Sequence, residues 1–351
     1  MNVHELPMIT FTVLAQMAVG AFVVLGIINL AARATGRYST ADLDEISNPA
    51  SYAIGATLIL GLGASMLHMN DPLHVLNVFR HVDSSWLSRE IVTGMGFSGF
   101  GFLYAACQFL KWGSAGFRQV LALVTALIGI VFLYSMSMVY YSVVTVPAWN
   151  TWVTPARFAT TALILGAFAI GTAFMTVVMY RRDAAEGGQA SGLVTGAATR
   201  AQRSFRKPLE SGAATTLLAR RRADTAAHDE GYSPRARALI LASLRGIAIA
   251  GIILLAIEFI LQPVHLMNLM NAGAAGIESA NAFSGALGIV RIILVCLGAG
   301  LLSLFLFRIA SSSAASPRPV AMVVTLAFAC VLVAEFLGRA AFYEQMTRIG
   351  M

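Results

Sequence analysis

The chain has 351 residues, of which 58% are hydrophobic and 12% are charged, and its formal net charge is +7. Its mean hydropathy of +0.74 is too high for a water-soluble protein of this length, so the composition predicts an integral membrane protein. Segment 181–237 alone supplies eleven basic residues, so the positive charge reports membrane topology and does not favour nucleic acid binding.

Eight apolar stretches are each long enough to cross a bilayer, whose hydrocarbon core of about 30 Å takes roughly 20 helical residues. They lie at 8–32, 50–69, 90–110, 117–141, 155–180, 238–262, 283–307 and 319–342. The predicted fold is an all-α bundle of eight transmembrane helices. Residues 1–180 hold the first five helices and 238–351 the last three. The segment between them, 181–237, is predicted to be a basic, flexible cytoplasmic loop.

The distribution of Lys and Arg between alternate loops predicts how these helices are oriented. One side has, besides the basic segment, Arg33, Arg37, Lys111, Arg118, Arg308 and Arg318. The other side has only Arg80, Arg89, Arg157 and Arg348. By the positive-inside rule the first side is cytoplasmic, so both termini are predicted to be periplasmic. The chain is accordingly expected in the bacterial cytoplasmic (inner) membrane, as a multi-pass protein.

Ionisable side chains gather on the outer side of the predicted helices. Charge is costly inside a bilayer, so each of these groups is a functional hypothesis if it faces protein. They are His68, Arg89, Glu90, Glu258, Arg291, Glu335 and Arg339. A histidine and a carboxylate beside a membrane-embedded pocket suit quinol oxidation. One group accepts a phenolic proton, and the other orients the ring or carries the proton away.

Structural roles for the same residues stay open. Glu335 and Arg339 are one turn apart and can form an ion pair within their helix. Alternatively, they can pair with Glu258 and Arg291 and hold the last three helices together. The histidine and the glutamate that flank the second loop can equally be interfacial anchors.

Metal cofactors are not expected in this chain. Of six histidines only His68 lies within a predicted helix, so a haem held by two histidines is disfavoured. Cys107, Cys296 and Cys330 lie inside helices without a C-x-x-C pair, so no iron-sulfur cluster is expected. The G-x-G-x-x-G pattern at 94–99 lies inside an apolar helix with no preceding strand and indicates helix packing.

Four aromatic residues near one membrane face allow two interpretations. They are Tyr140, Tyr141, Trp149 and Trp152. They predict an interfacial aromatic belt, or a surface on which a quinone ring stacks.

Short motifs along the sequence resemble the membrane anchor subunit of bacterial dimethyl sulfoxide reductase. They are HELP at 4–7 with FTVL at 11–14, ASMLH at 64–68 with SREI at 88–91, TVPAW at 145–149 with WVTP at 152–155, and EFLGRAAFY at 335–343. The resemblance covers 1–180 and, more loosely, 238–351. The long basic segment between them departs from the family pattern.

The resemblance implies a complex of three chains, in which this one anchors an iron-sulfur electron-transfer subunit and a molybdenum catalytic subunit on the periplasmic face. It also implies menaquinol as the bound substrate, with His68 and Glu90 at the quinol site. His68 is expected to take the proton, with Glu90 as its partner or relay. Electrons would pass directly to an iron-sulfur cluster of the partner, whose own chemistry sets the terminal acceptor.

The remaining ionisable residues are expected to support this site as a polar layer. These are Arg89, Glu258, Arg291, Glu335 and Arg339. Two alternatives belong to other functional classes. A secondary transporter predicts repeated halves and charges near the midplane, which five helices, a loop and three helices do not match. A structural anchor without its own quinol site is the other alternative.

Overall fold

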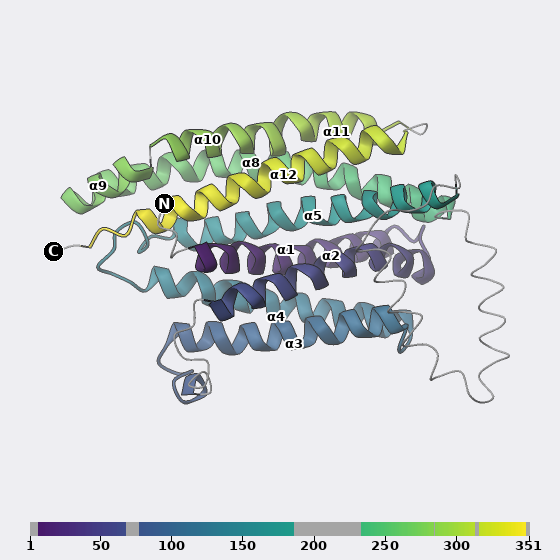
Figure 1. The fold of residues 1–351 in the computed structure, drawn as a ribbon, viewed down its shortest axis with the longest axis horizontal. Coiled ribbons are helices and arrows are strands. Elements are labelled where there is room, and N and C mark those ends of the chain that lie inside the picture. Colours follow the sequence, from purple (N-terminus) through teal and green to yellow (C-terminus); the bar gives the residue numbers. More distant parts are fainter. Residues whose placement is uncertain (1–5, 68–76, 186–232, 284, 313–315, 349–351) are drawn as a thin grey trace.

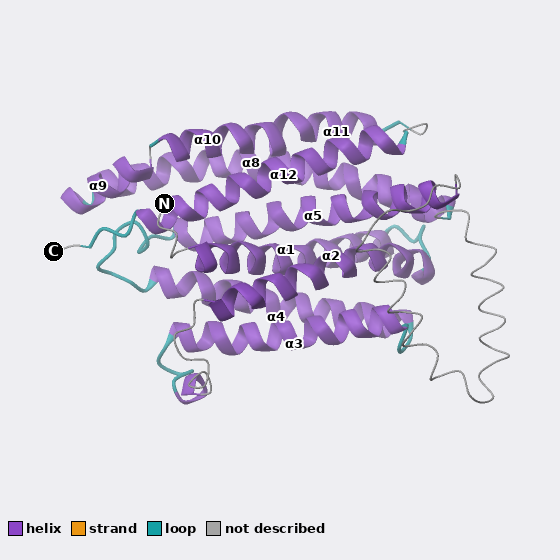
Figure 2. Ribbon diagram, in the orientation of Figure 1, coloured by secondary structure: helices purple, strands orange, loops and turns teal. Residues whose placement is uncertain are grey.

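The computed structural model describes residues 6–67, 77–185, 233–283, 285–312 and 316–348 (Figure 1). Within these ranges the regular structure is helical, and Figure 2 shows no strand. The helices are α1 (Leu6–Ala34), α2 (Thr40–Leu67), α3 (Trp86–Leu110), α4 (Ala115–Tyr141), α5 (Val153–Ala185), α8 (Pro234–Met270), α9 (Gly273–Phe283), α10 (Ala286–Val295), α11 (Ser303–Ala310) and α12 (Pro317–Glu344). A π-helical segment, Cys296–Leu302, joins α10 to α11.

Seven helical segments are long and apolar enough to cross a membrane. They are α1, α2, α4, α5, α8, α12 and the continuous stretch Ala286–Ala310, which contains α10 and α11. The glycine-containing α3 is not among them, although its 25 residues run beside α4 along the bundle (Figure 1). The all-helical membrane fold is therefore confirmed, while an eighth span and the periplasmic termini stay predictions.

Two predicted boundaries differ from the structure. Helix α2 begins at Thr40, ten residues before the predicted span, because the polar first turns continue the helix beyond the apolar run. Helix α8 continues through Pro263 to Met270. Most of the predicted loop 181–237 lies outside the described residues, and at its edges α5 reaches Ala185 and α8 begins at Pro234.

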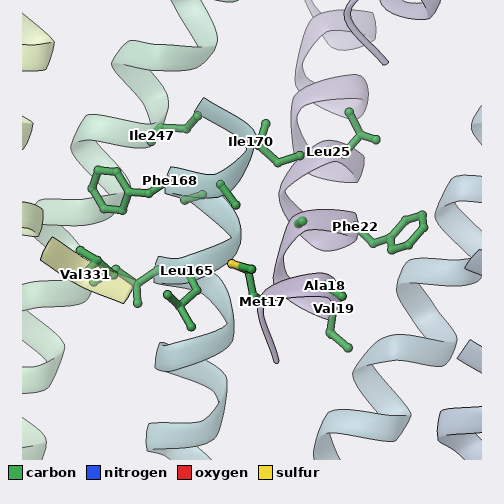
Figure 3. Close-up of a cluster of buried hydrophobic side chains, with 14 of the residues drawn as sticks. Met17, Ala18, Val19, Phe22, Leu25, Leu165, Phe168, Ile170, Ile247 and Val331 are labelled. Atoms are coloured by element: carbon green, nitrogen blue, oxygen red, sulfur yellow. The ribbon is translucent and has the colours of Figure 1, made fainter. Parts of the chain in front are cut away.

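Helix α1 lies inside the bundle, packed against α2, α4 and α5. In Figure 3, Met17 and Leu25 of α1 lie toward α5, whereas Phe168 of α5 points toward Ile247 of α8. Helices α1 and α5 cross very closely, since a Cβ atom built on Gly20 would lie 1.7 Å from the carbonyl oxygen of Ala162. Small residues at a crossing allow such an approach, and dispersion contacts between the backbones then hold the two helices together.

Helix α1 begins and α12 ends at the same end of the bundle, beside α9 (Figure 1). We call this the α9 end, and it corresponds to the predicted outer side. At the opposite end, Asp44 in the first turns of α2 accepts hydrogen bonds from three side chains at the α3–α4 turn. The donors are Arg118 Nη2 at 2.7 Å, Lys111 Nζ at 3.0 Å and Gln108 Nε2 at 3.0 Å. This polar cluster fastens α2 to α3 and α4.

Replacing Asp44 with alanine is expected to lower the free energy of unfolding by about 3 kcal/mol, because Arg118 is only 5% exposed and would lose its carboxylate. The measurement is the midpoint of thermal unfolding in detergent. Glu45→Ala is the matched control, since the neighbouring Glu45 pairs with Arg181 at 3.1 Å in a more exposed setting. That control should lose about 1 kcal/mol or less. Equal midpoints for the two variants would contradict the role given to Asp44.

Candidate functional site

Three of the predicted ionisable residues meet at one point, although they come from three helices. Arg291 of α10 donates from Nη2 to Glu258 Oε2 of α8 at 2.7 Å and to Glu335 Oε1 of α12 at 3.5 Å. Their exposed fractions are 4%, 6% and 4%. Pairing across the last three helices, one of the two alternatives left open by the sequence, is therefore present in the structure.

Helix α5 extends this group with two residues that sequence reasoning did not select. Arg157 Nη2 lies 3.8 Å from Glu258 Oε2, and Thr161 Oγ1 donates to Glu335 Oε2 at 2.7 Å. We call Arg157, Glu258, Arg291 and Glu335 the ion network. Arg157 and Thr161 are four residues apart and so share a face of α5, a spacing that was visible in the sequence. The ion network thus joins the last three spans to α5.

Arg339 does not form an ion pair with Glu335 in the described part of the protein. Its Nη2 instead donates to Gln16 Oε1 of α1 at 2.8 Å. The guanidinium carbon also lies 4.0 Å from the centre of the Phe158 ring and 5.2 Å from that of Phe342. A cation over an aromatic face is stabilised by the ring quadrupole, most strongly where water is excluded. Arg339 therefore connects α12 to α1 and α5.

Glu90 is a buried carboxylate near the start of α3, with 8% exposure. The helix begins there because the side chain of Ser85 caps it and accepts from the backbone N–H of Ser88. Within the described residues, no Lys or Arg nitrogen lies within 4.0 Å of the Glu90 carboxylate. Its nearest polar neighbours are two tyrosines on α4 and α12, Tyr140 and Tyr343, with which it interacts electrostatically.

The hydroxyls of Tyr140 and Tyr343 are hydrogen-bonded at 2.8 Å. The Tyr343 hydroxyl also lies 3.4 Å from Thr12 Oγ1 of α1. These groups place a short run of hydroxyls beside Glu90 at the α9 end. His68, the other predicted quinol residue, lies outside the described residues, so the structure neither brings it to Glu90 nor separates the two.

Arg89 lies apart from the ion network, at the loop before α3. Its Nε donates to the carbonyl of Val82 at 2.8 Å and its Nη2 to that of Asp83 at 2.7 Å. The guanidinium also covers the Trp86 ring at 4.2 Å. Its contacts are those of a residue that holds the loop in place.

The four aromatic residues near the membrane face divide into two pairs. Tyr141 and Trp152 are 36% and 56% exposed, as an interfacial belt requires. Tyr140 and Trp149 pack edge to face at 5.2 Å, and Trp149 Nε1 donates to the carbonyl of Phe342 at 2.9 Å. The inner pair is therefore part of the packed protein at the α9 end.

A small cavity of about 30 Å³ lies against the ion network. Arg157, Thr161, His265, Arg291, Glu335 and Arg339 are among the residues that line it. The volume holds about two water molecules and is far below that of a site for a drug-sized ligand. His265 is 2% exposed and its Nε2 lies 3.2 Å from Gln345 Oε1, whereas the sequence placed it in a loop.

Gly338 also lines this cavity, and its missing side chain leaves space for Arg291. A Cβ atom built on Gly338 would lie 2.5 Å from Arg291 Nε. The described residues contain no group of three or more His, Cys, Asp and Glu side chains that can hold a metal ion.

The sequence model of the DMSO reductase anchor subunit (DmsC) family matches residues 1–193, more than half of the chain. The chain belongs to this family. Membership confirms the resemblance that the motifs indicate. The match includes Glu90, Arg157 and Thr161, whereas Glu258, Arg291 and the residues of α12 lie beyond it.

Curated relatives align with about half of the chain. The anaerobic dimethyl sulfoxide reductase of Haemophilus influenzae has a C polypeptide that is 33% identical over 174 residues, which are 50% of this chain and 60% of the relative. Its Escherichia coli counterpart is 33% identical over 167 residues, 46% of this chain and 55% of the relative. The C polypeptide of a sulfite dehydrogenase from Allochromatium vinosum is 27% identical over 157 residues, 42% and 46% of the two proteins. The aligned part thus spans about half the length of these relatives.

Proposed function

We propose that this chain anchors a dimethyl sulfoxide reductase-type complex in the bacterial inner membrane and oxidises menaquinol at the α9 end of the bundle. The observation that carries the proposal is Glu90. A carboxylate that is 8% exposed, with no Lys or Arg within 4.0 Å in the described part of the protein, gains when it is protonated, because a buried charge without a partner is costly. Such a group suits the acceptance of a phenolic proton.

The mechanism uses two groups that flank the loop between α2 and α3. Menaquinol enters from lipid near the start of α3, and His68 hydrogen-bonds its hydroxyl and takes the proton. Glu90 receives that proton from His68, which is then ready for the second one. Complete oxidation of one quinol to a quinone releases two protons and two electrons. General base catalysis of this kind contributes typically about 10²- to 10⁴-fold in rate.

The electrons leave for an iron-sulfur cluster of a partner subunit docked at the α9 end, and from there for a molybdenum catalytic subunit. Family membership supports such partners, whose own chemistry selects the terminal acceptor. Protons and electrons leave on the same side of the membrane in this scheme. Quinol oxidation by the complex is then nearly electroneutral.

The test is anaerobic oxidation of a reduced menaquinol analogue by membranes that contain the assembled complex, with its acceptor present. Glu90→Gln and His68→Ala are each expected to lower this rate by about 100-fold or more. An artificial donor that reduces the soluble subunits directly should still work, which reports assembly. Glu278→Gln on the exposed surface of α9 is the matched control and should keep the wild-type rate.

A second candidate function is that of an anchor without its own quinol site. The small volume of the cavity favours it, since about 30 Å³ does not admit a quinone ring. This candidate predicts that Glu90→Gln and His68→Ala both keep wild-type quinol oxidation. That result would remove the quinol site from this chain.

A further inference from the structure

Proton release is a problem that the proposed quinol site leaves open. Each turnover delivers protons to Glu90, and this side chain is 8% exposed. A proton held there must leave before the next quinol is oxidised. The surroundings of Glu90 therefore matter as much as the carboxylate itself.

The Tyr140–Tyr343 pair is the nearest set of groups that can carry a proton. A hydroxyl both donates and accepts, so it passes a proton on without keeping a charge. The two hydroxyl oxygens are 2.8 Å apart, and both tyrosines interact electrostatically with Glu90. Tyr343 is 5% exposed, so bulk water does not reach this pair freely.

The cavity beside the ion network lies on the other side of this pair. Arg339 lines the cavity and also interacts electrostatically with Tyr140 and Tyr343, which brings the hydroxyls close to it. At the far side His265 lines the cavity and contacts Gln345, near the end of α12. The cavity thus extends from the tyrosine pair toward the α9 end.

Polar atoms around the cavity call for water. Glu258 Oε1, Arg291 Nε and Gln345 Nε2 are buried and have no hydrogen-bond partner among the described residues. Buried polar groups of this kind are generally satisfied by ordered water, and about 30 Å³ holds two such molecules. Water in this cavity would contact both the ion network and Gln345.

We propose that the Tyr140–Tyr343 pair and water in this cavity form the exit path for protons from Glu90, ending at His265 and Gln345. The proposal rests on the proposed quinol oxidation. Glu90 gives up its proton to the pair, each hydroxyl releases its own proton as it receives one, and water carries the charge outward. Arg339 is a positioning residue that keeps the pair beside the cavity.

The test is Tyr343→Phe, which removes one hydroxyl and keeps the ring. Menaquinol-analogue oxidation should fall about tenfold or more, and its solvent deuterium isotope effect should exceed that of the wild type because proton transfer becomes rate-limiting. Artificial-donor activity should not change. Tyr134→Phe is the matched control, since Tyr134 lies on α4 with 53% exposure and should keep the wild-type rate and isotope effect.

Glu90→Gln separates the two proposals. If it abolishes quinol oxidation while Tyr343→Phe keeps the wild-type rate and isotope effect, the exit path is wrong and the quinol site stands. If Glu90→Gln has no effect, the quinol site itself is wrong. Should Tyr343→Phe fail to assemble, Tyr140→Phe removes the other hydroxyl of the pair and must show the same larger isotope effect.

Discussion

Replacing Arg291 with methionine is expected to lower the free energy of unfolding by about 3 to 5 kcal/mol. The substitution keeps much of the side-chain volume but removes the cation that lies between Glu258 and Glu335. Both carboxylates are 6% exposed or less, and Arg157, at 3.8 Å from Glu258, is too distant to replace the lost hydrogen bonds. The measurement is the midpoint of thermal unfolding of the detergent-solubilised protein.

Neutralising the carboxylates as well should restore most of this loss. In the triple variant Arg291→Met, Glu258→Gln and Glu335→Gln, no charge is left without its counter-ion, and removing a whole buried ion group is often nearly neutral. A triple variant that is less stable than Arg291→Met alone would contradict the electrostatic explanation. It would mean that shape, and not charge, determines the packing around Arg291.

Gly20→Ala is expected to be the most disruptive single-methyl change in α1. The added Cβ would lie 1.7 Å from the carbonyl oxygen of Ala162, which is backbone and cannot rotate away. Helices α1 and α5 must separate to relieve this contact, at a cost of about 3 kcal/mol, the upper part of the range for overpacked cores. The amount of folded protein and its thermal midpoint in detergent measure the effect.

Gly26→Ala provides a control in the same helix. A Cβ atom built on Gly26 meets nothing within 4 Å. Alanine is the better helix former by about 1 kcal/mol, so this variant should be as stable as the wild type or slightly more stable. Similar losses for the two variants would mean that the close crossing of α1 and α5 does not determine stability.

The apolar runs predicted the helices well because a membrane helix must satisfy its backbone internally over a nearly fixed length. The same physics predicted that Glu258, Arg291 and Glu335 come together, since charges inside a bilayer seek partners. Hydropathy does not mark polar helical turns, however, so the early start of α2 at Thr40 and the cluster around Asp44 were missed.

Other contacts depend on packing that no local pattern reveals. Arg339 has Glu335 one turn away on its own helix, yet it donates to Gln16 of α1. Arg157 was counted as a loop charge because it stands near the edge of an apolar run, and its distance from Glu258 follows only once α5 lies beside α8. The places of Glu90 and His68 at a quinol site stay predictions.

The bonds between α1 and α12 have a consequence for the order in which the protein is built. Gln16 and Arg339 are separated by 323 residues, and Thr12 and Tyr343 by 331. At a synthesis rate of about 5 to 20 residues per second, α1 exists for some tens of seconds before α12 is made. During that time the buried amide of Gln16 has no Arg339 to bind. The bundle becomes complete only when its last span arrives, so a polypeptide that stops short of α12 should expose polar groups of α1 to quality control.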